Sequence, residues 1–197
     1  MKKYMEQKQK YVFLLTLILI GVLSGIMFIL FVSKADKQLI KEHLTLTFDT
    51  IKAHRVNYSS TLLNNCVKNV LSLMFIYISG ISIIGIPLIL LFLFFKGFIV
   101  GFSISSIVSI YHFKGVFISM LYLVPGDMLM LVIWILMGFY SISFSIKLFR
   151  YLFLKENISL NIYFKKLNKI LLISFISILV ISIIQTFLEP LIIDLCI

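Results

Sequence analysis

Long apolar blocks alternate with short basic stretches along this chain. Residues 11–32, 128–146 and 170–188 carry no charge, and residues 70–113 carry a single one, Lys96. A bilayer core about 30 Å thick is crossed by roughly 20 apolar residues of helix. The pattern therefore predicts an all-α integral membrane protein, with no water-soluble domain.

We predict five transmembrane helices within a single membrane domain over residues 1–197, at residues 11–32, 70–94, 97–113, 128–149 and 170–188. The second and third helices share one uninterrupted block, which needs a turn inside it.

Two places in that block could hold the turn. Gly85-Ile86-Pro87 would break a helix, because proline lacks an amide donor and crowds the preceding turn. Lys96-Gly97 combines the only charge of the block with a flexible residue. We place the turn at Lys96-Gly97, with Pro87 kinking the second helix. The third helix is short, so a re-entrant arrangement stays open.

The distribution of basic residues predicts the orientation. With the N-terminus inside, eleven of the 18 lysine and arginine residues fall on the cytoplasmic side and the other seven outside. Cytoplasmic loops of membrane proteins carry the excess of basic residues. We therefore expect the N-terminus inside and the C-terminus outside.

The overall composition agrees with a membrane protein. Hydrophobic residues make up 61% and charged residues 13% of the chain, and the mean hydropathy is +1.11. Soluble domains have roughly 45–50% apolar and 25% charged residues. The net charge of +10 indicates a topology signal and anionic membrane lipids as partners. No basic and aromatic patch on a soluble module points to nucleic acid.

The hydrophilic segments have a pattern of their own. In the outer loop, residues 33–69, apolar side chains recur at helical spacing (Ile40, Leu44, Phe48 and Ile51). This predicts an amphipathic helix that lies either on the membrane surface or a partner, or on the protein's own helices. The basic loop at 150–169 is expected on the cytoplasmic side, anchored at the lipid surface.

Small residues mark the faces where helices can approach closely in lipid. Gly21 and Gly25 lie four residues apart in the first predicted helix. Similar stripes follow in the third helix (Gly97, Gly101, Ser105 and Ser109) and in the fourth (Gly138, Ser141 and Ser145). Packing within the chain is the favoured interpretation. Pairing with a second copy or another protein is the alternative.

Polar residues near the predicted helices suggest little chemistry. We expect Lys96 at a turn near the cytoplasmic face, Asp127 as a helix cap after Pro125-Gly126, and Glu189-Pro190 as the end of the last helix. No carboxylate pair or histidine is expected in mid-membrane to relay protons. The sequence holds no zinc, nucleophile-turn or P-loop motif. We therefore predict no catalytic, cofactor or metal site, and no enzyme.

A Gly80-Ile-Ser-Ile-Ile-Gly85-Ile-Pro87 string is followed by Lys96-Gly97 and Gly101. Asparagines precede this string (Asn64, Asn65 and Asn69), Pro125 stands before the fourth helix, and Glu189-Pro190 follows the last. Together these features resemble the stage II sporulation protein M family of endospore-forming bacteria. The likeness covers most of the chain and is strongest over residues 64–101. The broader superfamily often has a histidine after the proline, whereas this chain has Pro125-Gly126-Asp127, so no histidine-dependent role carries over.

The resemblance implies a role in engulfment, when the mother-cell membrane moves around the forespore. Such proteins look like membrane scaffolds that gather two peptidoglycan-degrading partners, stage II sporulation proteins P and D, at the septal or engulfing membrane. Candidate contact elements here are the outer loop at 39–52 and the small-residue face at 97–109. The alternative function is a permease or channel-like subunit of a transport complex.

Overall fold

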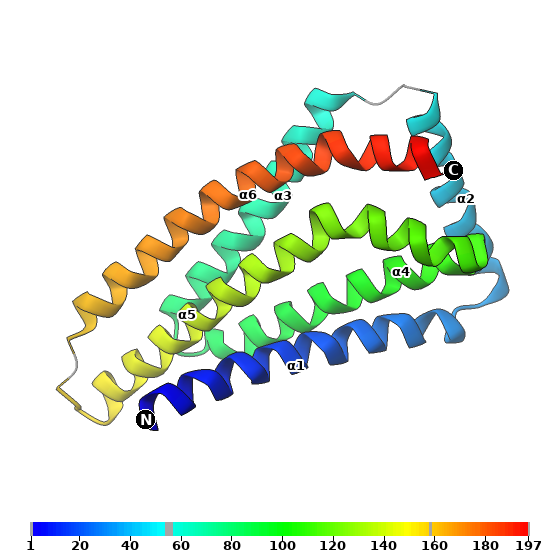
Figure 1. The fold of residues 1–197 in the computed structure, drawn as a ribbon. Coiled ribbons are helices and arrows are strands. Elements are labelled where there is room, and N and C mark those ends of the chain that lie inside the picture. The colour runs from blue at the N-terminus through cyan, green and yellow to red at the C-terminus, as the bar shows by residue number, and fades with distance from the viewer. Residues whose placement is uncertain (1, 54–56, 158, 197) are drawn as a thin grey trace.

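The protein is a bundle of long helices in the computed structural model, which describes residues 2–53, 57–157 and 159–196 (Figure 1). The elements of the described chain are α1 (Lys2–Phe31), α2 (Lys34–Lys52), α3 (Tyr58–Ile81), α4 (Gly85–Leu123), the π-helical segment η1 (Val124–Met128), α5 (Leu129–Phe153) and α6 (Leu160–Cys196). Within the described residues, five apolar stretches are long enough to cross a membrane: Lys8–Phe31, Tyr58–Ile81, Gly85–Leu123, Gly126–Phe153 and Leu160–Ile193. The prediction of an all-α protein with about five crossings is confirmed.

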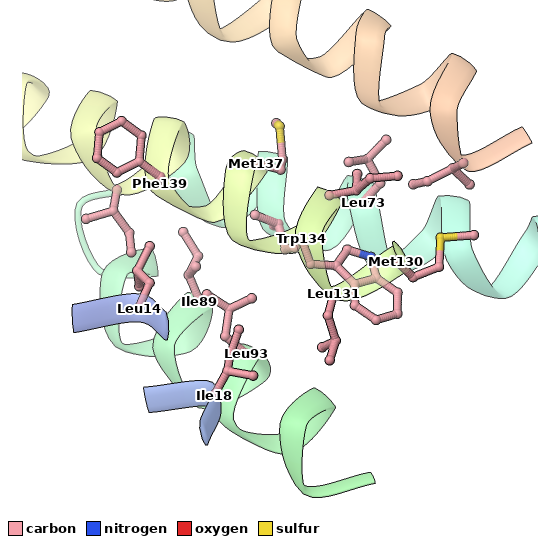
Figure 2. Close-up of a cluster of buried hydrophobic side chains, with 14 of the residues drawn as sticks. Leu14, Ile18, Leu73, Ile89, Leu93, Met130, Leu131, Trp134, Met137 and Phe139 are labelled. Carbon is pink, nitrogen blue, oxygen red and sulfur yellow. The ribbon is translucent and has the colours of Figure 1, made fainter. Parts of the chain in front are cut away.

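Helix α5, which lies in the fourth apolar stretch, occupies the middle of the bundle. This stretch is the most buried of the five. Figure 2 shows Trp134 and Met137 of α5 lying between Leu73 of α3 and the Ile89 and Leu93 side chains of α4. The outer helices leave their other faces exposed as an apolar surface, which suits contact with lipid.

The turn between the second and third crossings lies at residues 82–84, so the predicted turn at Lys96-Gly97 is wrong. Helix α3 ends at Ile81 and α4 starts at Gly85. A Cβ atom at position 85 would collide with the carbonyl oxygen of Ser79, so only glycine fits this close turn. The hydroxyl of Ser145 donates to the carbonyl of Ser82 at 2.9 Å and ties the turn to α5.

Pro87 therefore starts a helix and does not kink one. It is the third residue of α4, where the amide that proline lacks has no partner within the helix. Helices α3 and α4 thus start 12 residues before the predicted second helix (70–94) and third helix (97–113). The Gly85-Ile86-Pro87 alternative is the correct one.

Helix α4 folds back on itself at His112. This residue has a positive φ of 50°, which is not helical, and it divides α4 into two legs. A Cβ atom on Gly115 would meet the backbone of Ile107 and Val108, so the two legs of α4 lie against each other. Figure 1 shows the second leg returning into η1 and α5. The first leg of α4 thus ends close to residue 113, where the third helix was predicted to end. The returning leg was not predicted.

The predicted loop at 33–69 is largely helical. Ser33 caps α2, since its hydroxyl accepts the amide of Asp36 at 3.1 Å. Asn57 caps α3 in the same way through the amide of Ser60. The second crossing therefore starts about three turns before its predicted start at residue 70.

Helix α2 packs on the protein's own helices. Phe48 is 2% exposed and forms a cluster with Ile107, Ile118 and Ile193, with Leu44 and Ile51 beside it. Of the two interpretations left open for Leu44 and Phe48, packing within the chain is correct. We call helix α2, together with the cluster beneath it, the α2 end of the molecule.

Replacing Phe48 by alanine is expected to lower the free energy of unfolding by about 3 kcal/mol, because it leaves a cavity where α2, α4 and α6 meet. Leu46→Ala on the same helix is the matched control, because Leu46 is 64% exposed, and we expect a change below about 0.5 kcal/mol. Thermal unfolding of the detergent-solubilised proteins measures both. Equal stability of the two variants would contradict the packing of α2.

The last helix continues through Glu189-Pro190, so its predicted end at residue 188 is wrong. Pro190 lies inside α6, which runs on to Cys196. Proline removes one backbone hydrogen bond, to the carbonyl of Thr186. The extra turns place Ile193, with 0% exposure, in the Phe48 cluster, and this packing stabilises them. At the other end, α5 reaches Phe153 and α6 begins at Leu160, so much of the predicted loop at 150–169 is also helical.

Candidate functional site

Helices α1 and α4 meet along a seam of four glycines. Cβ atoms on Gly21 and Gly25 would come within 3 Å of the backbone of Phe94, Phe98 or Phe102. The counterparts on α4, Gly97 and Gly101, would meet the carbonyl oxygens of Ile18 and Val22. The backbones are in contact because none of the four carries a side chain. The small-residue face of the third crossing is thus used within the chain.

This seam sets the depth of Lys96 in the membrane. Gly21 lies in the middle of the uncharged stretch 11–32 and against the backbone of Phe94 and Phe98. Lys96 lies between those two residues, about 17 Å along α4 from Gly85. The prediction that Lys96 lies at a turn near the cytoplasmic face is therefore wrong.

Aromatic rings surround the Lys96 ammonium. Its Nζ lies 4.2 Å from the ring centroid of Trp134 and 5.2 Å from that of Phe92. A cation over an aromatic face is attracted by the ring quadrupole, more strongly where water is excluded. Trp134 is 4% exposed, and its indole N–H has no hydrogen-bond partner in the described structure.

Three more charged side chains belong to the same electrostatic network. Lys68 on α3 and Asp127 in η1 interact electrostatically with Lys96, and Glu189 on α6 interacts with Lys68 and Asp127. We call these four residues the charge cluster. Their formal charges sum to zero, which lowers the cost of placing them within membrane-spanning segments.

Two uncharged polar side chains lie beside the carboxyl groups of the charge cluster. Gln185 on α6 interacts with both Asp127 and Glu189. The hydroxyl of Tyr122, on the returning leg of α4, interacts with Glu189. A Cβ atom on Gly126 would stand 2.7 Å from the Gln185 amide carbon, so this glycine lets η1 approach α6. The cluster therefore joins four elements.

Asp127 does not cap a helix, contrary to the prediction. Helix α5 begins without a side-chain cap hydrogen bond, and Asp127 lies inside the continuous helical path from α4 through η1. The side chain of Pro125 lies outside the described part of the structure. Short π-helical segments recur at functional sites. Asp127 also interacts electrostatically with Glu189 of α6, a neighbourhood that the sequence did not predict.

A row of polar contacts joins α3 to α6 beside the charge cluster. Asn65 donates to Thr186 at 3.4 Å, Asn69 donates to Ser182 at 3.3 Å, and the Tyr77 hydroxyl donates to Asn168 at 2.8 Å. Hydrogen bonds between helices stabilise association in lipid by about 1 kcal/mol each. The two asparagines of the predicted set therefore have a packing role.

The remaining predicted residues lie in helix contacts. Gly80 packs against the side chain of Ser141 on α5. The buried Ser105 donates back to the carbonyl of Phe102 at 3.0 Å. Gly138 lies against Leu93 of α4. In the described chain, no three histidine, cysteine, aspartate or glutamate side chains are grouped as metal ligands would be.

Sequence reasoning missed the charge cluster because its members are far apart in the chain. The four residues lie at positions 68, 96, 127 and 189. One signal was available: Gln185 and Glu189 share a face of the last helix at four-residue spacing. Placing the turn at Gly85 would also have moved Lys96 to the middle of a crossing.

Comparison with known proteins agrees with the resemblance. The family model described as Stage II sporulation protein M matches residues 12–190. Searches of curated proteins and of solved structures give no match. The match covers all five apolar spans almost completely. This chain is thus a sporulation-related, multi-pass membrane protein and belongs to the Stage II sporulation protein M family.

Proposed function

We propose that this protein is a non-enzymatic scaffold for engulfment, located in the mother-cell septal or engulfing membrane. It would recruit two peptidoglycan-degrading partners, stage II sporulation proteins P and D. The observation that carries the proposal is the family match over residues 12–190. The proposal also fits a chain whose described residues are nearly all helix within or beside the membrane spans.

The α2 end is the surface best suited to recruitment. In the predicted orientation it faces outward, the side on which peptidoglycan lies. The small-residue face at 97–109 was the other candidate contact surface. Its glycines already pack against α1, so α2 is the candidate that we keep. Leu39 and Leu46 are 54% and 64% exposed on α2, and their seven-residue spacing puts them on one face. Exposed apolar anchors among charged residues suit a protein interface.

The test is recovery of the two hydrolases with the tagged full-length protein from sporulating cells. The wild-type protein is expected to co-purify with both. The double variant Leu39→Asp/Leu46→Asp is expected to reduce their recovery at least about fivefold, because buried charge at an interface costs several kcal/mol. Thr47→Asp introduces one negative charge on the same helix, off this face, and is expected to retain the partners.

Two results would refute the scaffold assignment or its surface. Wild-type protein that recovers neither hydrolase would refute recruitment itself. Undiminished recovery with the leucine variant, at normal expression and unfolding temperature, would refute the α2 face as the contact surface.

The charge cluster favours a second candidate, a permease or channel-like subunit. Ionisable side chains within membrane helices commonly mark ion or substrate pathways, and here two carboxyl groups and two ammonium groups interact electrostatically. Solute or ion flux from the purified protein in liposomes separates the two functions. A scaffold gives no flux, whereas a channel or permease gives flux that is lost on substitution of Lys96.

A further inference from the structure

A cavity of about 610 Å³ opens between α2, the end of α1 and the first leg of α4 just before His112. Ile29 and Leu30 from α1 form an apolar side. Lys37, Lys41 and Glu42 from α2 supply charges, and Ser109 from α4 supplies a hydroxyl group. This volume lies within the range of sites for small ligands, roughly 300–1,000 Å³. The cavity therefore combines an apolar wall with charged groups of both signs.

The cavity lies at the depth of lipid headgroups. The last turn of α1 is apolar and open, since Leu30 is 71% and Phe31 81% exposed. Two residues later, Ser33 caps α2 and the chain becomes highly charged. Such a change from apolar to charged residues marks the interface between acyl chains and water. A lipid can thus reach the cavity from the membrane without leaving it.

The charges in the cavity match the two charges of a zwitterionic headgroup. Lys37 and Lys41 are one helical turn apart and line the same side, so they can hold a phosphodiester between them. Glu42 is held in place by the amide of Gln38 at 3.3 Å and is an acceptor for a primary ammonium. Ser109 has an oxygen available beside Ile110. Charge complementarity selects a phosphate and an ammonium in one ligand.

We propose that this cavity is a binding site for a membrane phospholipid with a phosphoethanolamine headgroup. The phosphate binds Lys37 and Lys41, the ammonium binds Glu42, and one acyl chain lies along Ile29 and Leu30. The bound lipid connects α2 to the end of α1 and to the first leg of α4. The proposal is independent of the scaffold and transport assignments.

The test is lipid binding to the purified full-length protein in mild detergent. Phosphatidylethanolamine is added in mixed micelles, and the bound lipid is counted by native mass spectrometry. Lys37→Gln/Lys41→Gln is expected to weaken retention about tenfold or more, because each basic residue near a lipid phosphate contributes measurably to binding. Lys34→Gln, an exposed position on the first turn of α2 outside the cavity, is expected to change retention less than twofold.

A second variant distinguishes the headgroup. Glu42→Gln is expected to weaken binding of phosphatidylethanolamine and to leave that of phosphatidylglycerol, which lacks the ammonium, unchanged. Equal losses for Lys34→Gln and the cavity variant would overturn the site, as would unchanged retention in the cavity variant. Displacement of the lipid by millimolar inorganic phosphate would show a free-anion site and would also overturn the proposal.

Discussion

Replacing Gly101 by alanine is expected to destabilise the protein by about 3 kcal/mol or more, the upper part of the range for overpacking. The added methyl group would collide with the carbonyl oxygen of Val22. Backbone atoms cannot rotate away as a side chain does, so α1 and α4 have to separate along the whole glycine seam. Denaturation of the detergent-solubilised protein, followed by tyrosine and tryptophan fluorescence, measures the change.

Gly138→Ala is the matched control for this prediction. Its methyl group would meet Cδ1 of Leu93 at 3.0 Å, and the end of a leucine side chain can shift by a few tenths of an ångström. We expect a loss below about 1 kcal/mol. If both alanine variants were equally stable, α1 would not depend on close backbone contact with α4.

Replacing Lys96 by methionine is expected to have the second largest effect, a loss of about 2–4 kcal/mol. The substitution keeps the length of the side chain but removes its charge over Trp134 and Phe92. Asp127 and Glu189 then share only Lys68 as a counter-charge among the four residues of the cluster. Removing one member of a buried charged group costs more than removing both.

The double variant Lys96→Met/Asp127→Asn tests this explanation. It restores zero formal charge, and we expect it to be more stable than Lys96→Met alone. Lys165→Met is the control at an exposed lysine of α6 and is expected to change stability by less than about 0.5 kcal/mol. Strict additivity of the two cluster substitutions would mean that Lys96 and Asp127 are not coupled.

The number and type of helices could be predicted because each uncharged block carries its own signal in local composition. The family was also identifiable, since its motif around Gly80–Gly101 is contiguous in the chain. The placement of Lys96 could not be predicted in the same way. A lone charge in an apolar block is typical of a turn, and only the distant residues Asp127 and Trp134 make its central position tolerable.

The ends of the helices depended on tertiary packing as well. Glu189-Pro190 has the local features of a helix end, yet burial of Ile193 against Phe48 stabilises the last turns. The small-residue faces could be recognised from glycines and serines four residues apart. This spacing does not indicate which helix packs against such a face. The structure shows that Gly97 and Gly101 face Ile18 and Val22 of the same chain.

The glycine seam has a consequence for biosynthesis. Gly21 and Gly97 are separated by 76 residues, counted from their positions. At translation rates of roughly 5–20 residues per second, the first span waits about 4–15 s in the bilayer before its mate is made. During that interval the backbone of α1 at Gly21 and Gly25 is accessible to lipids, to insertion factors and to other membrane helices. Newly made chains therefore pass through a stage in which α1 can pair with another helix, and this surface is covered once α4 has packed on it.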